Sequence, residues 1–317
     1  MSARSDPPKL SWSDLKVCEL PADSETLNLE HTLDCAQSFR WRRSGDSWIG
    51  TIGDRVFRLR RSSAHSLEVR SFPEDDALPT LAGYLQLDTP LGALRSLDDP
   101  AINVALAELP GLRVTRQPVF EAIVTYLASA ANNVTRITRT LDRLVDIAGE
   151  PIAHIDGRLL RAFPSPQALA CCTESHLRGV GLGFRAPHVR DFAVTVALGD
   201  SPVADLISYS GQYREDRRML CRIGGVGPKI ADCVCLFGMG HHEAVPVDTH
   251  VWAIARRLFP EAGINGPAPD PCGYERAADL FRARFGPMAG WAQQYLFHAR
   301  RRERSLPSPS AVSLQDA

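Results

Sequence analysis

The sequence predicts an α+β protein in which an antiparallel sheet precedes a larger, all-helical body. Two observations support this class. Between about residues 26 and 72, short runs of alternating apolar and polar residues are separated by turn residues, as in antiparallel strands. From about residue 76 onward, apolar residues recur at intervals of three or four, as they do along helices that bury one face.

The strand-like segment contains two evident hairpin turns. Ser44-Gly45-Asp46 and Gly53-Asp54 stand between alternating runs, and glycine-containing turns of this kind favour tight hairpins. Strands are therefore expected at residues 26–33, 37–43, 47–52, 55–60 and 66–70.

The helical segment carries apolar periodicity almost to its end. Helices are expected at residues 119–131, 134–147, 166–178, 185–198, 213–223, 228–239, 249–259, 274–285 and 288–304. The chain then divides into an N-terminal arm (1–25), which we expect to be loose, a sheet domain (26–115) and a helical domain (116–304). The Ser/Pro-rich tail (305–317) is expected to be disordered.

The composition narrows the class of protein. The 317 residues carry a formal net charge of −1, so a surface that attracts nucleic acid must be local. The eight cysteines include no CxxC pair, which disfavours a structural zinc site or a disulfide framework. No apolar run reaches the length of a membrane span, and the polar N-terminus does not read as a signal peptide. We therefore expect an intracellular protein.

One lysine is the most informative residue of the chain. Of 36 lysines and arginines, only three are lysines, and Lys229 is the only one after residue 16. An ammonium group can lose its proton and act as a nucleophile, whereas a guanidinium cannot. Lys229 follows the glycine-rich turn 224–228 and opens the apolar run 230–237, so it is expected in the first turn of a helix.

The turn before Lys229 has the signature of a helix-hairpin-helix. Gly225 and Gly227 can adopt positive φ angles and leave backbone N–H groups exposed. Pro228 suits the first turn of the second helix, and the positive end of that helix favours a phosphate. Such contacts hold a nucleic-acid backbone without reading its sequence, although an ordinary helix–turn–helix connection would also fit this turn.

Asp248 lies 19 residues beyond Lys229 and immediately before a predicted helix. An aspartate at this position is a strong N-cap signal. A cap also holds a carboxylate firmly, and an amine together with a fixed carboxylate is what cleavage of a glycosidic C–N bond requires. The carboxylate stabilises positive charge on the sugar while the amine attacks the anomeric carbon and forms a Schiff base.

At this point the motifs resemble those of the HhH-GPD superfamily of DNA base-excision glycosylases, and in particular its 8-oxoguanine DNA glycosylases. The main matching motifs are G-V-G-x-K-x-A-D-C at 225–233 and V-P-V-D-x-H at 245–250. Further matches are QSFRW at 37–41, GLGFR at 181–185 and GWAQ at 290–293. The resemblance covers roughly residues 26–302 and implies a sheet domain like that of the TATA-binding protein, packed on the helical body.

The resemblance also implies roles for individual residues. Lys229 would be the nucleophile and Asp248 the catalytic carboxylate. Cys233 and Phe297 would pack on opposite faces of a base flipped out of the duplex, while Gln293 would read its Watson–Crick edge. The other implied roles are phosphate contact by His250 and the hairpin glycines, and a structural cation on the carbonyls of Cys221, Ile223 and Val226.

The chain departs from the family pattern in the base pocket. Ala36 stands where the family has a glycine whose carbonyl accepts the N7–H that distinguishes 8-oxoguanine from guanine. The methyl group would crowd the pocket or resist the backbone angle that this position needs.

A second group of departures concerns the residues that face the partner strand. Ala131 replaces the first of three asparagines, and Asn132 and Asn133 remain. Arg136 and Arg185 match arginines that read the cytosine opposite the lesion, and Phe184 replaces a tyrosine that wedges into the duplex.

The function implied is that of a bifunctional glycosylase and AP lyase that removes 8-oxoguanine opposite cytosine from double-stranded DNA. No cofactor or iron–sulfur cluster is expected. The enzyme is expected to be a monomer without membrane contact, located with genomic DNA in a bacterial cytoplasm or nucleoid or in a eukaryotic nucleus.

Three alternatives remain open. An endonuclease-III-like enzyme would share the lysine, but it usually has four clustered cysteines for an iron–sulfur cluster. Another glycosylase of the superfamily would act on a different lesion, although adenine and alkylated-base glycosylases lack the lysine. A non-catalytic DNA-binding module would use the hairpin alone, without Lys229, Asp248 and Gln293.

Overall fold

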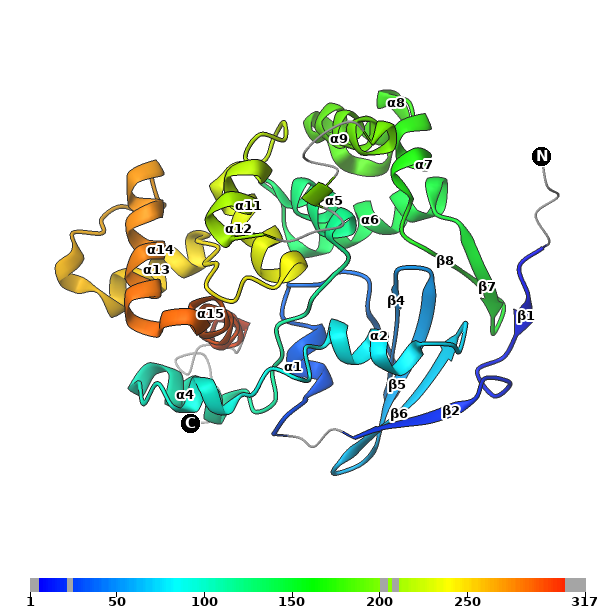
Figure 1. Cartoon of the computed structure of the whole chain (residues 1–317), viewed down its shortest axis with the longest axis horizontal. Coiled ribbons are helices and arrows are strands. Elements are labelled where there is room, and N and C mark those ends of the chain that lie inside the picture. Colours follow the sequence, from blue (N-terminus) through cyan, green and yellow to red (C-terminus); the bar gives the residue numbers. More distant parts are fainter. Residues whose placement is uncertain (1–5, 22–24, 200–204, 207–210, 306–317) are drawn as a thin grey trace, which may run out of the picture.

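The computed structural model describes residues 6–21, 25–199, 205–206 and 211–305 (Figure 1). The predicted tail from residue 306 onward lies outside the described residues. An N-terminal sheet is followed by a larger helical body (Figure 1), so the predicted α+β class is confirmed. None of the described helices is both long and apolar enough to cross a membrane.

The main sheet has five antiparallel strands in the order β2-β6-β5-β4-β3. Gly45 and Gly53 close two of its hairpins with φ angles of 60° and 59°. The strands are β2 (Val17–Pro21), β3 (Arg42–Ser44), β4 (Ser47–Ile52), β5 (Arg55–Ser63) and β6 (Ser66–Phe72). The predictions of strands at 47–52, 55–60 and 66–70 are therefore confirmed.

Two strand predictions are wrong. Residues 26–33 contain helix α1 (Leu29–Leu33), because Asn28 caps it by accepting a hydrogen bond from the His31 N–H. Residues 37–41 form an irregular loop instead of a strand. The amide of Gln37 donates to the carbonyls of Thr32 and Arg113 at 2.8 and 2.7 Å, so these buried carbonyls are satisfied by a side chain and not by a neighbouring strand.

The described part of the expected loose arm is paired with the rest of the fold. Strand β1 (Lys9–Leu10) runs parallel to β7 (Pro151–Ile155), beside which it lies in Figure 1. Trp12 and Leu15 are buried in a small core with Val56 of β5. The expectation of a loose arm is therefore wrong for residues 9–21.

The helical body also contains strands, so it is not all-helical as predicted. Strand β7 pairs with β8 (Arg158–Arg161) in an antiparallel hairpin, and together with β1 they form a separate three-stranded sheet. Asp156 and Gly157 turn the chain between β7 and β8 with φ angles of 48° and 76°.

Three helices connect the main sheet to the body: α2 (Ala77–Tyr84), α3 (Gly92–Arg95) and α4 (Pro100–Glu108). Leu81 and Tyr84 of α2 are buried in one core with Phe57, Leu59 and Leu67 of the sheet. This apolar face holds α2 against the sheet, beside which α2 lies in Figure 1.

The predicted helices of the body are present, with ends that shift by a few residues. They are α5 (Val119–Ser129), α6 (Val134–Ala148), α7 (Pro166–Cys171), α8 (Glu174–Leu177), α9 (Ala186–Leu198), α11 (Tyr213–Leu220), α12 (Pro228–Val234), α13 (Thr249–Leu258), α14 (Pro271–Phe285) and α15 (Ala289–Ser305). The single helix expected at 166–178 is broken, because Cys172 is extended and Thr173 caps α8. The helix expected at 228–239 ends in a π-helical turn, Cys235–Met239.

Helix α5 lies at the centre of the body. Its residues from Phe120 to Ala128 are all buried, as expected of a helix surrounded by other elements. Tyr126 of α5 stacks on Phe237 with ring centroids 5.7 Å apart. The packing of α5 against the segment that begins with α12 therefore joins the middle of the body to the hairpin.

The main sheet contains a glycine that a larger residue cannot replace without movement. A Cβ at Gly50 would clash with the indole of Trp41, which is buried and donates to the Tyr84 hydroxyl at 3.0 Å. We expect Gly50→Ala to destabilise the protein by about 1–3 kcal/mol. Gly83→Ala is the control: it lies in α2 with open space around it, so it should stabilise by about 0.5–1 kcal/mol. Thermal unfolding of both variants measures the difference, and equal shifts would contradict the predicted clash.

Candidate active site

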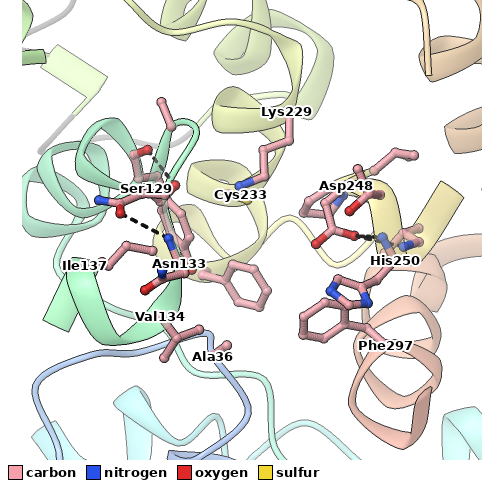
Figure 2. A pocket seen from close by; sticks show the side chains of 18 of the residues that line it. Ala36, Ser129, Asn133, Val134, Ile137, Lys229, Cys233, Asp248, His250 and Phe297 are labelled. Carbon is pink, nitrogen blue, oxygen red and sulfur yellow. Dashed lines mark hydrogen bonds between the residues drawn. The ribbon is translucent and has the colours of Figure 1, made fainter. Parts of the chain in front are cut away.

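A cavity of about 570 Å³ lies where the sheet domain meets the helical body (Figure 2). Its walls come from the loop around Ala36, the α5–α6 connection, the start of α12, the start of α13 and one face of α15. The predicted site residues that line it are Ala36, Asn132, Asn133, Lys229, Cys233, Asp248, His250, Gln293 and Phe297. Its volume is in the range of cavities that bind small molecules.

Lys229 occupies the first turn of α12, directly after the hairpin. Gly225 has a φ of 81°, and a Cβ there would lie 2.7 Å from the ring of His188. Gly227 is extended, with a φ of −94°, so the expectation of a positive φ is wrong for this residue. The Lys229 side chain projects into the cavity (Figure 2), where its Nζ lies 6.0 Å from the centroid of the Tyr126 ring.

Asp248 is the N-cap of α13. Its Oδ1 accepts hydrogen bonds from the backbone N–H groups of His250 and Val251 at 2.9 and 2.8 Å. Figure 2 shows Lys229 and Asp248 on the same cavity, and each stands at the amino end of a helix. The two N–H groups hold the carboxylate in one position.

Cys233 lies one turn after Lys229 and is buried, with an exposure of 4%. Burial raises the pKa of its thiol to about 11, an effect that the Lys229 charge opposes and that the carboxylates of Asp232 and Asp248 reinforce. At neutral pH Cys233 is therefore a protonated thiol, which is a weak nucleophile. It offers the cavity a neutral, polarisable surface beside the lysine.

Helix α15 contributes two residues from one face. Gln293 is 3% exposed, and no hydrogen-bond partner of its Oε1 is found among the described residues. A buried acceptor in this state costs free energy, which a ligand that donates to it would recover. Phe297 meets the ring of His250 edge to face, with centroids 5.7 Å apart. The cavity therefore combines an aromatic wall with an unsatisfied polar group.

Ala36 has a φ of 62°, in the left-handed region that costs a residue with a Cβ about 1–2 kcal/mol. The carbonyls of the residues before and after it, Cys35 and Gln37, are held by side chains. Gln294 donates to the Cys35 carbonyl at 3.2 Å, and Gln117 and Tyr126 donate to the Gln37 carbonyl at 2.7 and 2.8 Å. These bonds fix the loop and leave Ala36 at the cavity wall.

The asparagines of the α5–α6 connection bond to the backbone near them. Asn132 donates to the Ala128 carbonyl at 3.1 Å. Asn133 is the N-cap of α6 and accepts from the Arg136 N–H. Ala131 has a φ of 46°, so the chain turns sharply at this residue.

Phe184, Arg185 and Arg136 lie outside the cavity lining. Phe184 is 60% exposed, and the guanidinium of Arg185 stacks on its ring at 4.3 Å. Arg185 is buried and donates to the carbonyls of Ala130 and Ala131. Burial and the nearby Arg136 charge lower the pKa of Arg185. Arg185 thus braces the turn before α6, whereas Arg136 is exposed.

The hairpin carbonyls proposed for a cation are partly engaged. The Ile223 carbonyl accepts from the Val226 N–H at 3.0 Å. No group of three or more histidine, cysteine or acidic side chains that could hold a metal occurs in the described part of the chain. All eight cysteines are free thiols.

Sequence reasoning missed a buried carboxylate that braces the site. Asp232 is 0% exposed and accepts from the Tyr213 hydroxyl, the Arg217 Nε and the Tyr274 hydroxyl at 2.7, 2.9 and 2.6 Å. Burial raises the pKa of this carboxyl and the Arg217 charge opposes the effect. Only the A-D-C motif pointed to Asp232, because its partners lie on distant helices.

Two family models match the chain. The 8-oxoguanine DNA glycosylase N-terminal domain matches residues 19–123, and the HhH-GPD superfamily base excision DNA repair protein matches residues 124–269. Together with the hairpin lysine and the capped aspartate, these matches define the class: a base-excision DNA glycosylase of the HhH-GPD superfamily.

Similar proteins narrow the class further. The N-glycosylase/DNA lyase OGG1 of Arabidopsis thaliana is 33% identical over 93% of this chain and 81% of its own length. An N-glycosylase/DNA lyase of Saccharomyces cerevisiae is 30% identical over 89% of this chain and 85% of its own length. The chain belongs to the 8-oxoguanine DNA glycosylase family, whose members are both N-glycosylases and DNA lyases.

Solved structures agree with this assignment. An 8-oxoguanine glycosylase/lyase of Clostridium acetobutylicum, bound to double-stranded DNA with cytosine opposite 8-oxoguanine, has a TM-score of 0.80 and 27% identity over 92% of this chain and 99% of its own. A structure of MBOgg1 with a low-affinity DNA ligand has a TM-score of 0.82 and 28% identity over 91% of this chain and 96% of its own.

The left-handed alanines of the site predict a measurable effect on stability. Ala36→Gly and Ala131→Gly should each stabilise the protein by up to about 1 kcal/mol, because the relief of strain exceeds the entropy gained by the unfolded chain. Ala130, whose φ is −55°, is the control, and Ala130→Gly should destabilise by about 0.4–1 kcal/mol. Urea unfolding of the three variants measures these changes. Loss of stability in Ala36→Gly would show that its backbone is not strained.

Proposed function

We propose that this enzyme removes 8-oxoguanine from duplex DNA through a Schiff base on Lys229 and then cleaves the strand by β-elimination. The observation that carries the proposal is the pairing of one lysine amine with one capped carboxylate in a single cavity, at the amino ends of α12 and α13. A DNA-binding module without catalysis would require neither this cavity nor these two groups.

The first step breaks the glycosidic bond. The lone pair of the Lys229 Nζ forms a bond to C1′ of the sugar, while the C1′–N9 bond breaks and its electron pair leaves with the base. Nζ then gives up one proton, and the base takes one up. Positive charge develops on the sugar during this exchange. The Asp248 carboxylate, held by two backbone N–H groups, would stabilise that charge.

The second step cleaves the strand. The C1′–O4′ bond opens, O4′ gains a proton, and the C1′–Nζ bond becomes a Schiff base. Loss of a proton from C2′ then expels the 3′ phosphate, and water releases Lys229 from the product. All of these steps use an amine, a carboxylate and water, which supports an enzyme that requires no cofactor.

The cavity suits a flipped purine. The base would lie between the neutral thiol of Cys233 and the ring of Phe297, with its Watson–Crick edge at the unsatisfied Gln293 Oε1. The Ala36 carbonyl would accept the N7–H of 8-oxoguanine. Guanine has a bare acceptor at N7, so two acceptors would face each other and binding would be disfavoured.

Residues in and around the cavity would also contact the rest of the duplex. We assign phosphate contacts to His250 and to the backbone N–H groups of the hairpin at Gly225 and Gly227. A cation on the carbonyls of Cys221, Ile223 and Val226 would support the same hairpin.

The partner strand faces a second group of residues. Phe184 would wedge into the stack, and Arg136, Asn132 and Asn133 would lie against the strand that carries the cytosine. Arg185 would act mainly by holding the turn at Ala130 and Ala131. The enzyme would act as a monomer in the compartment that contains genomic DNA.

The covalent step gives a direct test. Borohydride should trap the wild-type enzyme on an 8-oxoguanine duplex, because it reduces the Schiff base. Lys229→Gln should abolish trapping and retain DNA binding, and Lys16→Gln, at an exposed lysine, is the matched control. Denaturing gels measure the cross-link. Trapping that survives Lys229→Gln would exclude this lysine as the nucleophile.

The aspartate combines a structural and a chemical role, which substitution can separate. Asp248→Asn should keep most of the cap, because asparagine caps nearly as well, and should lose most of the excision rate because it lacks the charge. Asp270→Asn changes the N-cap of α14 outside the chemistry and serves as control. Single-turnover excision and thermal unfolding are measured together. A cost of about 1–2 kcal/mol in stability with normal excision would leave Asp248 as a cap only.

Recognition of the partner base should be weaker than in relatives with three asparagines. Excision should be fastest opposite cytosine, since a good arginine contact contributes about 1–3 kcal/mol of discrimination. Arg136→Ala should flatten this preference and Ala131→Asn should sharpen it. Single-turnover rates opposite each of the four bases test both statements. Equal rates of the wild type opposite all four bases would show that Arg136 does not read the partner base.

A further inference from the structure

A second glutamine of α15 touches the loop that presents Ala36. Gln294 is buried beside Gln293, and its Nε2 donates to the Cys35 carbonyl at 3.2 Å, across 259 positions of sequence. Its side chain also hydrogen-bonds to the Cys35 thiol. The last helix of the body therefore holds the sheet domain at the residue immediately before Ala36.

This contact acts on the peptide group that sets the φ angle of Ala36. The Cys35 carbonyl and the Ala36 N–H belong to one planar peptide, so fixing the carbonyl fixes the plane. Gln117 and Tyr126 hold the Gln37 carbonyl, which belongs to the Gln37–Ser38 peptide. The Ala36 carbonyl lies in the peptide between these two held peptides, so its direction is restrained from both sides.

The hydrogen bond from Gln294 to the Cys35 carbonyl matters more with alanine at position 36 than it would with glycine. The φ of 62° at Ala36 is unfavourable for a residue with a Cβ and persists only where surrounding contacts impose it. Among the described residues, Gln294 supplies the side-chain donor to the Cys35 carbonyl. Without it, the Cys35–Ala36 peptide is free to rotate toward an extended conformation and carry the Ala36 carbonyl away from the cavity.

We propose that Gln294 is a positioning residue for lesion specificity, which holds the Cys35–Ala36 peptide so that the Ala36 carbonyl faces the base. The proposal rests on the proposed function, because the carbonyl has this role only if a base enters the cavity. Gln294 and Gln293 then divide the work of α15: one holds the loop that reads the base, and the other contacts the base.

The test compares two reactions that share Lys229 but differ in whether a nucleobase must enter the cavity. Gln294→Leu removes the donor at similar volume. Single-turnover excision of 8-oxoguanine opposite cytosine should fall about tenfold, as expected for the loss of one buried hydrogen bond. A preformed abasic site has no nucleobase, so the rate of β-elimination there should stay within about twofold of the wild-type rate.

Two further variants separate positioning from general stability. Ala36→Gly removes the strain, so Gln294→Leu should cost clearly less excision in that background than in the wild type. Gln86→Leu is the matched control. Gln86 is also a buried glutamine that donates to a backbone carbonyl, that of Val114 at 2.9 Å, but it does not line the cavity. This variant should leave the ratio of excision to β-elimination unchanged.

The outcomes are distinct. An unchanged ratio of excision to β-elimination in Gln294→Leu would overturn the proposal, whether both rates stay normal or fall together. An equal cost of Gln294→Leu with alanine and with glycine at position 36 would also overturn it. Absence of 8-oxoguanine excision by the wild type would overturn the proposed function and this inference together. Normal excision by both the wild type and Gln294→Leu would overturn this inference alone.

Discussion

The buried carboxylate of Asp232 is the interaction on which the site depends. It joins α11, α12 and α14 through two phenols and a guanidinium, and it sits one turn from Lys229 on the same helix. The Tyr274 hydroxyl also accepts a hydrogen bond from the N–H of Val247, the residue before Asp248, at 3.4 Å. One anion therefore braces the helix that carries the lysine and the segment that carries the aspartate. Removing either partner of such a buried pair is costly because a charge remains unpaired.

The two domains divide the site between them. The helical body supplies the lysine, the aspartate and the aromatic wall, whereas the sheet domain supplies one short loop at Ala36. That loop is held from the body by Gln294, Gln117 and Tyr126. The chemistry therefore belongs to the body, and the choice of base depends on how accurately the two domains are joined.

Much of this arrangement could be predicted from the sequence, because its signals are local. Lys229 and Cys233 are one helical turn apart and Asp248 begins a helix, so these local patterns, together with the family resemblance, pointed to each of them. The hydrogen bond to the Cys35 carbonyl was missed because its donor, Gln294, lies at the other end of the chain. Helix α1 was mistaken for a strand because residues 26–33 fit both periodicities over so short a length. Strands β1 and β7 were missed because two or five residues carry too little pattern.

The pairing of β1 with β7 has a consequence for synthesis. Strand β6 ends at Phe72, so the five-stranded sheet has all of its strands early in translation, whereas β1 pairs with residues His154 and Ile155. At about 5–20 residues per second, the ribosome reaches that point several seconds after it has made β1. Among the described strands, the first is thus one of the last to find its partner. It cannot pair with β7 until the early part of the helical body has been made.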